Sequence, residues 1–152
     1  MAKKLNPTQF VKAVTRSFMA ESGLEPRYFR IVSAAEGRVD FELDIANNHT
    51  GTIASMVDLG GSLAVASTGR FATGVSTDLN VTYLSPGGRV GDKLTGTAIC
   101  DKIGKTLAYT TVTFTNAKGQ LAARGSHTKY VNGTMGEAGP FVAPAGFTDD
   151  VE

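Results

Sequence analysis

Apolar residues recur at helical spacing in two parts of the chain. Near the N-terminus, residues 1–19 have one apolar side that we expect to face the core, formed by Phe10, Val11, Val14 and Phe18. In residues 51–67 a second apolar stripe is formed by Ile53, Met56, Val57, Leu63 and Ala64. Each pattern predicts a helix that packs by one side against another layer of the fold.

Apolar and polar residues alternate in two further segments, which predicts strands. Within residues 28–45, the segment RVDFELDI alternates after a glycine turn at Gly37. In residues 74–84 an apolar side alternates strictly with a polar side, namely Val75, Leu79, Val81 and Tyr83 against Ser76, Asp78, Asn80 and Thr82. Three more strands, joined by hairpin-length turns, are predicted over residues 92–103, 105–116 and 120–131.

The order of these elements, which is helix, strand, helix and then four strands, indicates an α+β fold with an antiparallel sheet. A long central helix wrapped by a curved sheet in this order is the hotdog fold, which we expect for residues 1–131 as a single domain. The Gly- and Pro-rich residues 132–152 are expected to form a mobile tail, although Phe141 and Phe147 offer side chains that would dock on a surface. Small residues on the central helix and a free sheet edge indicate a homodimer.

Composition narrows the classes of function. The 152 residues carry a formal net charge of +1, so no overall attraction to nucleic acid or anionic membranes is expected. No apolar run is long enough to cross a bilayer, and the single cysteine, Cys100, indicates a reducing compartment. We therefore expect a cytoplasmic protein. Residues 1–19 are basic and contain no acid, as is also typical of a presequence, so the mitochondrial matrix stays an alternative.

Asp58 is the only formally charged residue between Asp44 and Arg70. Because it lies within the predicted central helix, we expect its carboxylate to be buried, where an unpaired charge is costly. It then either forms an ion pair with a cation from a partner or serves in chemistry, and both interpretations stay open on the residues alone. Its neighbours on the helix surface are mostly small, which would admit another backbone or a slim ligand: Ala54, Gly61, Ser62 and Val65.

The two histidines do not indicate a metal site, because they are far apart in the sequence and have no cysteine cluster nearby. We interpret His49 as a residue that shapes the entrance of the central helix. His127 alternates in a strand on the same side as Lys129, which is typical of a half-buried sheet residue. We expect no metal.

Four segments together resemble one known family. They are HTGTIASMVDLGGSLA, GVSTDLNVTYLSP, KIGKTLAYTTVTFTN and RGSHTKY, and the similarity covers about residues 41–130. In these segments the chain resembles the PaaI-type hotdog acyl-coenzyme A thioesterases. The resemblance implies an active site across the interface of a homodimer, and a homotetramer formed as a dimer of dimers.

The resemblance also implies roles for individual residues. Asp58 matches the catalytic carboxylate of the family, and Ser76 matches a serine that the partner subunit contributes. The family's His-Gly-Gly segment, in which a backbone N–H is thought to bind the thioester oxygen, is matched by His49, Thr50 and Gly51. Thr50 keeps the backbone donor but adds a β-branched side chain, and a family asparagine six residues before the histidine is replaced by Leu43.

Two stretches match those that hold the coenzyme A nucleotide and pantetheine in that family. The first comprises Tyr83, Leu84, Ser85, Pro86, Gly87 and Gly88, followed by Arg89. The second comprises Lys102, Ile103, Gly104, Lys105, Thr106 and Leu107. Without the resemblance, the basic turn is weak evidence for ligand binding, because lysine and glycine at the tip of a hairpin are usually just solvated turn residues.

Thioester hydrolysis is the reaction that these residues permit. Backbone N–H groups at the start of the helix would stabilise the oxyanion, while Asp58 acts as general base for water that Ser76 holds, or attacks the carbonyl itself. We predict an acyl-CoA thioesterase of fatty acid metabolism that acts on medium- or long-chain or aromatic acyl groups and needs no cofactor. A hydratase or dehydratase in which His49 works with Asp58, and a non-catalytic acyl-CoA-binding protein, stay open as alternatives.

Overall fold

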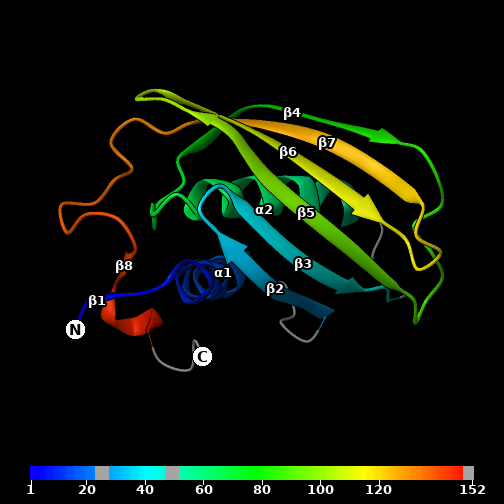
Figure 1. Ribbon diagram of the computed structural model, residues 1–152, viewed down its shortest axis with the longest axis horizontal. Helices are drawn as coiled ribbons and strands as arrows, with labels where there is room; N and C mark the ends of the chain where they lie inside the picture. Colours follow the sequence, from blue (N-terminus) through cyan, green and yellow to red (C-terminus); the bar gives the residue numbers. More distant parts are fainter. Residues whose placement is uncertain (23–27, 47–51, 149–152) are drawn as a thin grey trace.

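The computed structural model describes residues 1–22, 28–46 and 52–148 (Figure 1). Two helices occur in this part of the chain, α1 (Pro7–Ser22) and α2 (Thr52–Ala66), together with a short 3-10 turn at Ala145–Phe147. The strands are β1 (Lys3–Lys4), β2 (Phe29–Ala35), β3 (Arg38–Asp44), β4 (Val75–Tyr83), β5 (Lys93–Ile103), β6 (Leu107–Thr115), β7 (Leu121–Tyr130) and β8 (Val142–Ala143). Neither helix combines the length and the hydrophobicity that a bilayer crossing needs.

Six strands form one antiparallel sheet in the order β2-β3-β5-β6-β7-β4, and α2 packs against its β5, β6 and β7 strands (Figure 1). The prediction of an α+β hotdog fold is confirmed. The two helices and the last four strands lie where the sequence predicted them. The segment before Gly37 was not predicted as a strand of its own, but it forms β2, which pairs with β3 through a turn in which Gly37 has a φ of 82°.

Close contact between α2 and the sheet depends on glycine. A Cβ added at Gly61 would lie 2.7 Å from Thr110 Oγ1 and equally close to the Cβ and Nδ1 of His127, whereas one at Gly60 would lie 3.2 Å from a methyl group of Val112. The small side of α2 was expected to admit a partner backbone or a ligand. At Gly61 it instead receives β6 and β7 of the same chain, because the helix needs that space to approach its own sheet.

The C-terminal segment docks on α1. Strand β8 pairs with β1, the ring of Phe141 lies 5.5 Å from that of Phe10, and the ring of Phe147 lies 5.6 Å from that of Phe71. Phe10 also belongs to the apolar side of α1 that was predicted to face the core, and it is fully buried together with Val11 and Val14. Of the two expectations for the tail, docking through Phe141 and Phe147 is the one that the structure supports.

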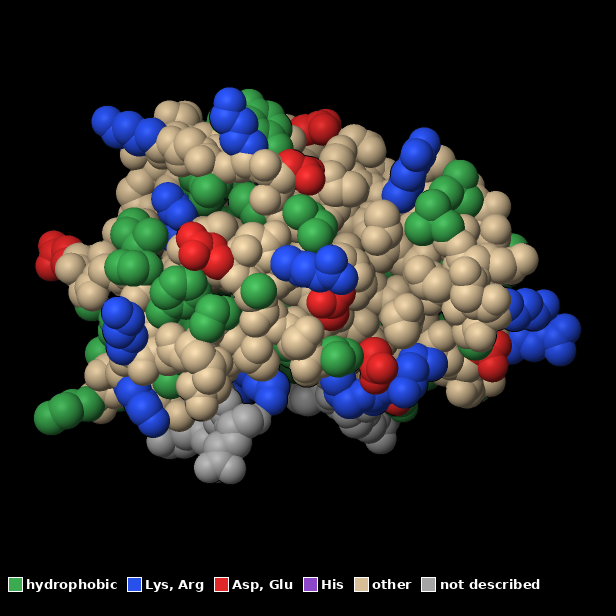
Figure 2. All heavy atoms as spheres, in the orientation of Figure 1, with side chains coloured by type: hydrophobic (Ala, Val, Ile, Leu, Met, Phe, Trp, Pro, Cys, Tyr) green, Lys and Arg blue, Asp and Glu red, His purple; other side chains and the backbone are tan. Residues whose placement is uncertain are grey.

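Strand β4 forms one edge of the sheet. All its side chains except the half-buried Val81 are exposed, so the alternation of apolar and polar residues in this strand does not separate a buried side from a solvated one. Val75 and Tyr83 are among the most exposed large apolar residues. On the face of the molecule shown in Figure 2, basic and acidic side chains are interspersed rather than gathered into a region of one charge, in keeping with the small net charge of the chain.

Candidate active site

Asp58 lies in the middle of α2, and 60% of its side-chain surface is exposed. The expectation that this carboxylate is buried was therefore wrong. The neutral residues around it in the sequence, such as Val57 and Leu59, fill the sides of α2 that face the core, whereas Asp58 projects from the uncovered side. Water solvates the carboxylate there, so Asp58 does not need a cation to offset a desolvation cost.

His127 on β7 lies behind Asp58 and connects it to Ser76 on β4. The Nε2 atom of His127 is 3.7 Å from Asp58 Oδ1 and 2.6 Å from Ser76 Oγ, and its Nδ1 atom is 3.2 Å from the backbone oxygen of Asp58. The imidazole is fully buried, whereas Ser76 is exposed like Asp58. The two side chains that reach solvent are thus linked through a buried ring within a single chain.

Ser76 therefore reaches the same site as Asp58 without a second subunit. The role of Ser76 from a partner subunit stays a prediction. His127 was interpreted from the sequence as a half-buried strand residue, and its place beside Asp58 was missed. The signal that was available is its alternation with Lys129, which puts both residues on the side of β7 that faces α2.

Lys129 completes the polar cluster. It is 4% exposed, and its Nζ donates hydrogen bonds to Ser62 Oγ on α2 at 2.6 Å and to Thr73 Oγ1 at 3.2 Å. Burial lowers the pKa of Lys129 from 10.5 to about 8, and the negative charge of Asp58 opposes this shift. A buried ammonium group whose two hydrogen-bond acceptors are neutral hydroxyls leaves a positive potential around it.

Burial also lowers the pKa of His127, and the positive charge of Lys129 lowers it further, while Asp58 and two backbone hydrogen bonds act in the opposite direction. The usual pKa of a histidine is 6.5. At neutral pH the imidazole is therefore uncharged, and its 3.7 Å approach to Asp58 is not an ion pair.

The N-terminus of α2 borders an apolar cavity of about 230 Å³. Its walls are formed by Leu43, Ile45, Thr52, Ile53, Tyr83, Gly87, Gly88 and Leu94, so three members of the first predicted substrate-binding stretch line it. The predicted site residues His49, Thr50 and Gly51 lie outside the described residues.

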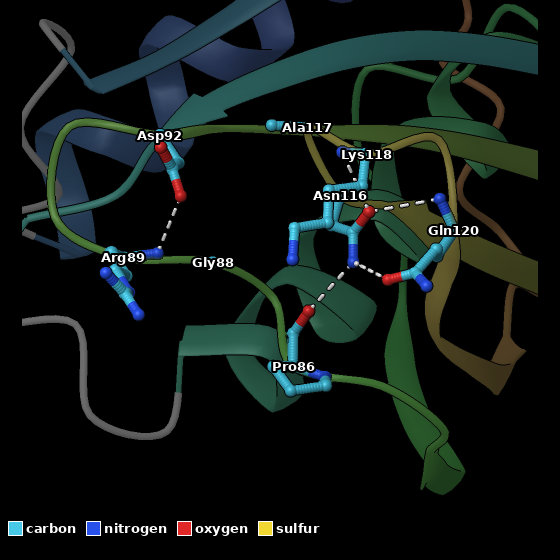
Figure 3. Close-up of a pocket in the computed structure, with 8 residues that line it drawn as sticks. All are labelled: Pro86, Gly88, Arg89, Asp92, Asn116, Ala117, Lys118 and Gln120. Carbon is cyan, nitrogen blue, oxygen red and sulfur yellow. Dashed lines mark hydrogen bonds between the residues drawn. The ribbon is translucent and has the colours of Figure 1, made fainter.

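A second cavity of about 590 Å³ lies between the β4–β5 loop and the β6–β7 hairpin (Figure 3). We call it the polar cavity because charged and amide side chains belong to its wall. Arg89 lines it from the loop, beside Pro86 and Gly88, and Lys118 lines it from the hairpin. Asn116 ties the two segments together, because its Nδ2 donates to the backbone oxygen of Pro86 and its Oδ1 accepts from the backbone N–H of Lys118, each at 3.0 Å. Two cationic residues thus line a braced cavity, with Asp92 as the acidic residue in its wall.

The second predicted stretch, Lys102–Leu107, lies at the opposite end of the sheet from these cavities (Figure 1). Leu107 pairs with Tyr130, and Tyr130 pairs with Val75, the first residue of β4. Tyr83 is the last residue of that strand, and a strand of this length extends over roughly 27 Å at about 3.4 Å per residue. A single chain therefore does not bring the two stretches to one ligand.

Comparison with known proteins adds to this geometry. The thioesterase superfamily profile matches residues 47–123. The human acyl-coenzyme A thioesterase 13 is 39% identical over 132 residues, which cover 81% of this chain and 92% of that protein. The crystal structure of thioesterase superfamily member 2 from Mus musculus aligns with a TM-score of 0.74 and 32% identity over 84% of this chain and 99% of the other.

A third protein, smu.793 from Streptococcus mutans, was solved bound to acetyl-CoA and aligns with a TM-score of 0.63 and 26% identity over 70% of this chain and 90% of its own. Because the family profile and the human relative each match more than half of the chain, the resemblance drawn from the four sequence segments is confirmed. The chain belongs to the thioesterase superfamily, and the enzyme class predicted from its sequence, a thioester hydrolase, is confirmed with it.

Proposed function

We propose that this protein hydrolyses acyl-coenzyme A thioesters, with Asp58 as the general base. The observation that carries the proposal is the cluster in which an exposed carboxylate and an exposed serine hydroxyl meet the same buried imidazole nitrogen. A water molecule between Asp58 and Ser76 would have an acceptor for its proton and a second polar group to orient it. The name of the human relative and the acetyl-CoA complex of the bacterial one support this substrate class.

The reaction then proceeds in two steps. Asp58 takes a proton from the water while the oxygen of that water attacks the carbonyl carbon. The carbonyl oxygen then becomes an oxyanion near the positive N-terminus of α2. The carbon–sulfur bond then breaks, and the proton passes from Asp58 to the departing thiolate, which leaves as coenzyme A with the free acid. The backbone N–H groups of Thr50 and Gly51 keep the oxyanion role that the family resemblance implies.

The two cavities suit the two parts of such a substrate. The apolar cavity beside Ile53 and Leu94 suits the acyl chain, because burial of methylene groups there is favourable. The polar cavity with Arg89 and Lys118 suits the phosphate groups of coenzyme A, which need cations. Medium- or long-chain fatty acyl groups, or aromatic ones, are the substrates that we propose.

A homodimer through β4 would bring the remaining predicted residues to the site. The outer edge of β4 has exposed side chains, and a free strand edge favours pairing with another strand. Antiparallel pairing of two β4 strands about a two-fold axis places the start of one beside the end of the other. The Lys102–Leu107 turn of a second copy would then approach the Tyr83–Gly88 stretch of the first. A dimer of dimers is proposed on the family resemblance alone.

Thiol release from acetyl-, octanoyl- and palmitoyl-CoA tests the proposed reaction. We expect the wild type to release thiol and Asp58→Asn to lose roughly 10²- to 10⁴-fold in kcat, the usual contribution of a general base. Glu36→Gln is the matched control, because Glu36 is also exposed but lies in the β2–β3 turn, and we expect its rate to equal that of the wild type. Equal rates for wild type and Asp58→Asn would remove Asp58 from the mechanism.

The assay also separates the alternatives, since a hydratase adds water to an enoyl-CoA without releasing thiol and a binding protein does neither. Sedimentation velocity at assay concentrations tests the dimer. A fully active monomer would overturn the proposal that a second copy completes the site.

A further inference from the structure

We infer that His127 and Lys129 are positioning residues that fix the direction of the hydrogen bond made by Ser76, so that this serine accepts a hydrogen bond from the attacking water instead of donating one. The inference rests on the proposed function, because it concerns the water that Asp58 would activate. Neither residue touches the substrate in this account, and both act through Ser76.

The first step is the position of the proton on the ring. His127 Nδ1 lies 3.2 Å from the backbone oxygen of Asp58, and a backbone hydrogen bond to Val57 also acts on the ring. A carbonyl oxygen only accepts hydrogen bonds, so Nδ1 must carry the hydrogen. In the neutral ring Nε2 then carries a lone pair and no hydrogen, so it can only accept a hydrogen bond.

The second step follows for Ser76. Its Oγ atom lies 2.6 Å from that Nε2, so the serine hydroxyl must donate its hydrogen to the ring. The remaining lone pairs of Oγ are free to accept from water at the exposed side of the cluster. One hydrogen of the water then points to Ser76 and the other to Asp58, and the lone pair of the water is left for the carbonyl carbon.

The arrangement requires an uncharged imidazole, and the surroundings of His127 favour that form. The charged groups that act on the ring are Asp58 from α2 and Lys129 from its own strand. Strand β4 contributes the neutral Ser76, and β6 contributes Thr110, whose hydroxyl donates to the backbone oxygen of His127 at 2.6 Å. Burial and the ammonium group of Lys129 together disfavour the imidazolium.

Protonation of His127 would reverse the arrangement. Nε2–H would donate to Ser76, whose own hydrogen would then point toward the water, and the imidazolium would form an ion pair with Asp58 across the present 3.7 Å. The water would lose one acceptor, and the general base would be weakened. Activity should therefore fall as the pH decreases through the pKa of His127.

Two variants and two measurements test the inference. NMR titration of the imidazole C–H resonance of His127, assigned by its absence in His127→Gln, reports the charge of the ring whether or not the protein hydrolyses anything. In Lys129→Met, which removes the charge but keeps an apolar stem, we expect the titration midpoint of His127 to move to higher pH, and the acid limb of kcat/KM to move with it. Lys4→Met, at an exposed position on β1, is the control and should move neither.

His127→Gln separates this effect from the titration of Asp58. Glutamine offers an uncharged acceptor for Ser76 but does not titrate, so the acid limb of its kcat/KM profile should move to lower pH, opposite to the change in Lys129→Met. A midpoint of His127 that is unchanged in Lys129→Met, or an acid limb that is unchanged in a folded His127→Gln, would overturn the inference. If the wild type releases no thiol from any acyl-CoA, the proposed function fails, and the NMR titration still decides whether Lys129 controls the charge of the ring.

Discussion

The contact between α2 and the sheet at Gly61 gives the sharpest test of how the fold positions the site. Replacing Gly61 by alanine would place a methyl carbon 2.7 Å from atoms of His127 and Thr110, where a carbon atom normally needs about 3.5 to 4.0 Å. Two of these atoms, His127 Cβ and Thr110 Oγ1, lie one bond and two bonds from the backbone, so rotation of a flexible side-chain end cannot relieve the contact. The helix and the sheet must therefore separate by about 1 Å.

The size of the effect is the difference between two terms. Alanine stabilises a helix by about 1 kcal/mol relative to glycine, whereas overpacking a core costs about 1 to 3 kcal/mol. We expect Gly61→Ala to be neutral or to lower the free energy of unfolding by up to about 2 kcal/mol. Gly60→Ala has the same gain in helix propensity but a contact of 3.2 Å with a methyl group of Val112, which can yield by a few tenths of an ångström, so it should be more stable than Gly61→Ala by about 1 kcal/mol or more.

Urea denaturation of the two glycine variants measures this difference, and acyl-CoA hydrolysis by the same samples measures its consequence for the site. Because Gly61 packs on His127, we expect Gly61→Ala to lose kcat even under conditions where it is fully folded, while Gly60→Ala keeps it. A Gly61→Ala variant that is at least as stable as Gly60→Ala, with unchanged kcat, would refute the close packing of α2 on β7.

Three further predictions concern Lys129, the C-terminal segment and the polar cavity. Lys129 holds its proton up to about pH 10.5 in the unfolded chain but only up to about 8 in the folded protein, so it makes the free energy of unfolding rise with pH across that window, by up to about 3 kcal/mol. Urea midpoints measured at pH 7.5 and 10 should therefore rise less in Lys129→Met than in the wild type. An equal rise in both proteins would contradict the depressed pKa of Lys129. Phe141→Ala removes a ring that packs on Phe10 and should lower the free energy of unfolding by about 2 to 3 kcal/mol. The control Leu121→Ala, at an exposed position, should change it by less than about 0.5 kcal/mol. Similar losses in the two variants would mean that the tail does not dock. Replacing both Arg89 and Lys118 by glutamine should raise KM for acyl-CoA and leave kcat unchanged, while an unchanged KM would remove the phosphate groups from this cavity.

Most secondary structure followed from the sequence because periodicity reports which side of an element is apolar. Strand-favouring residue types between hairpin-length turns identified β6 and β7, strict alternation identified β4, and helical spacing identified α1 and α2. Strand β2 was missed because it is an edge strand with a mixed burial pattern, so its sequence does not alternate. The same limitation applies to β4, whose alternation was real but did not correspond to a buried side.

The site was predicted only in part. Asp58 stood out because it is charged among neutral residues, but that isolation in sequence was taken as burial, and exposure depends on which side of α2 the sheet covers. Ser76 came from the family resemblance. His127 and Lys129 gave little signal, because a histidine and a lysine in an alternating strand are ordinary until the partners across the fold are known.

By itself, the sequence determined the helices, the last four strands, the hotdog fold and the family, because local periodicity and the four segments that resemble the family are properties of neighbouring residues. Only the tertiary structure decided that Asp58 is open to solvent, that His127 connects it to Ser76, and that the Lys102–Leu107 turn lies away from the cavities. The physical reason is distance along the chain. Asp58 and His127 are 69 residues apart, and Ser76 and His127 are 51 apart, so their contacts exist only after α2 has packed on β7 and β4 has paired with its edge.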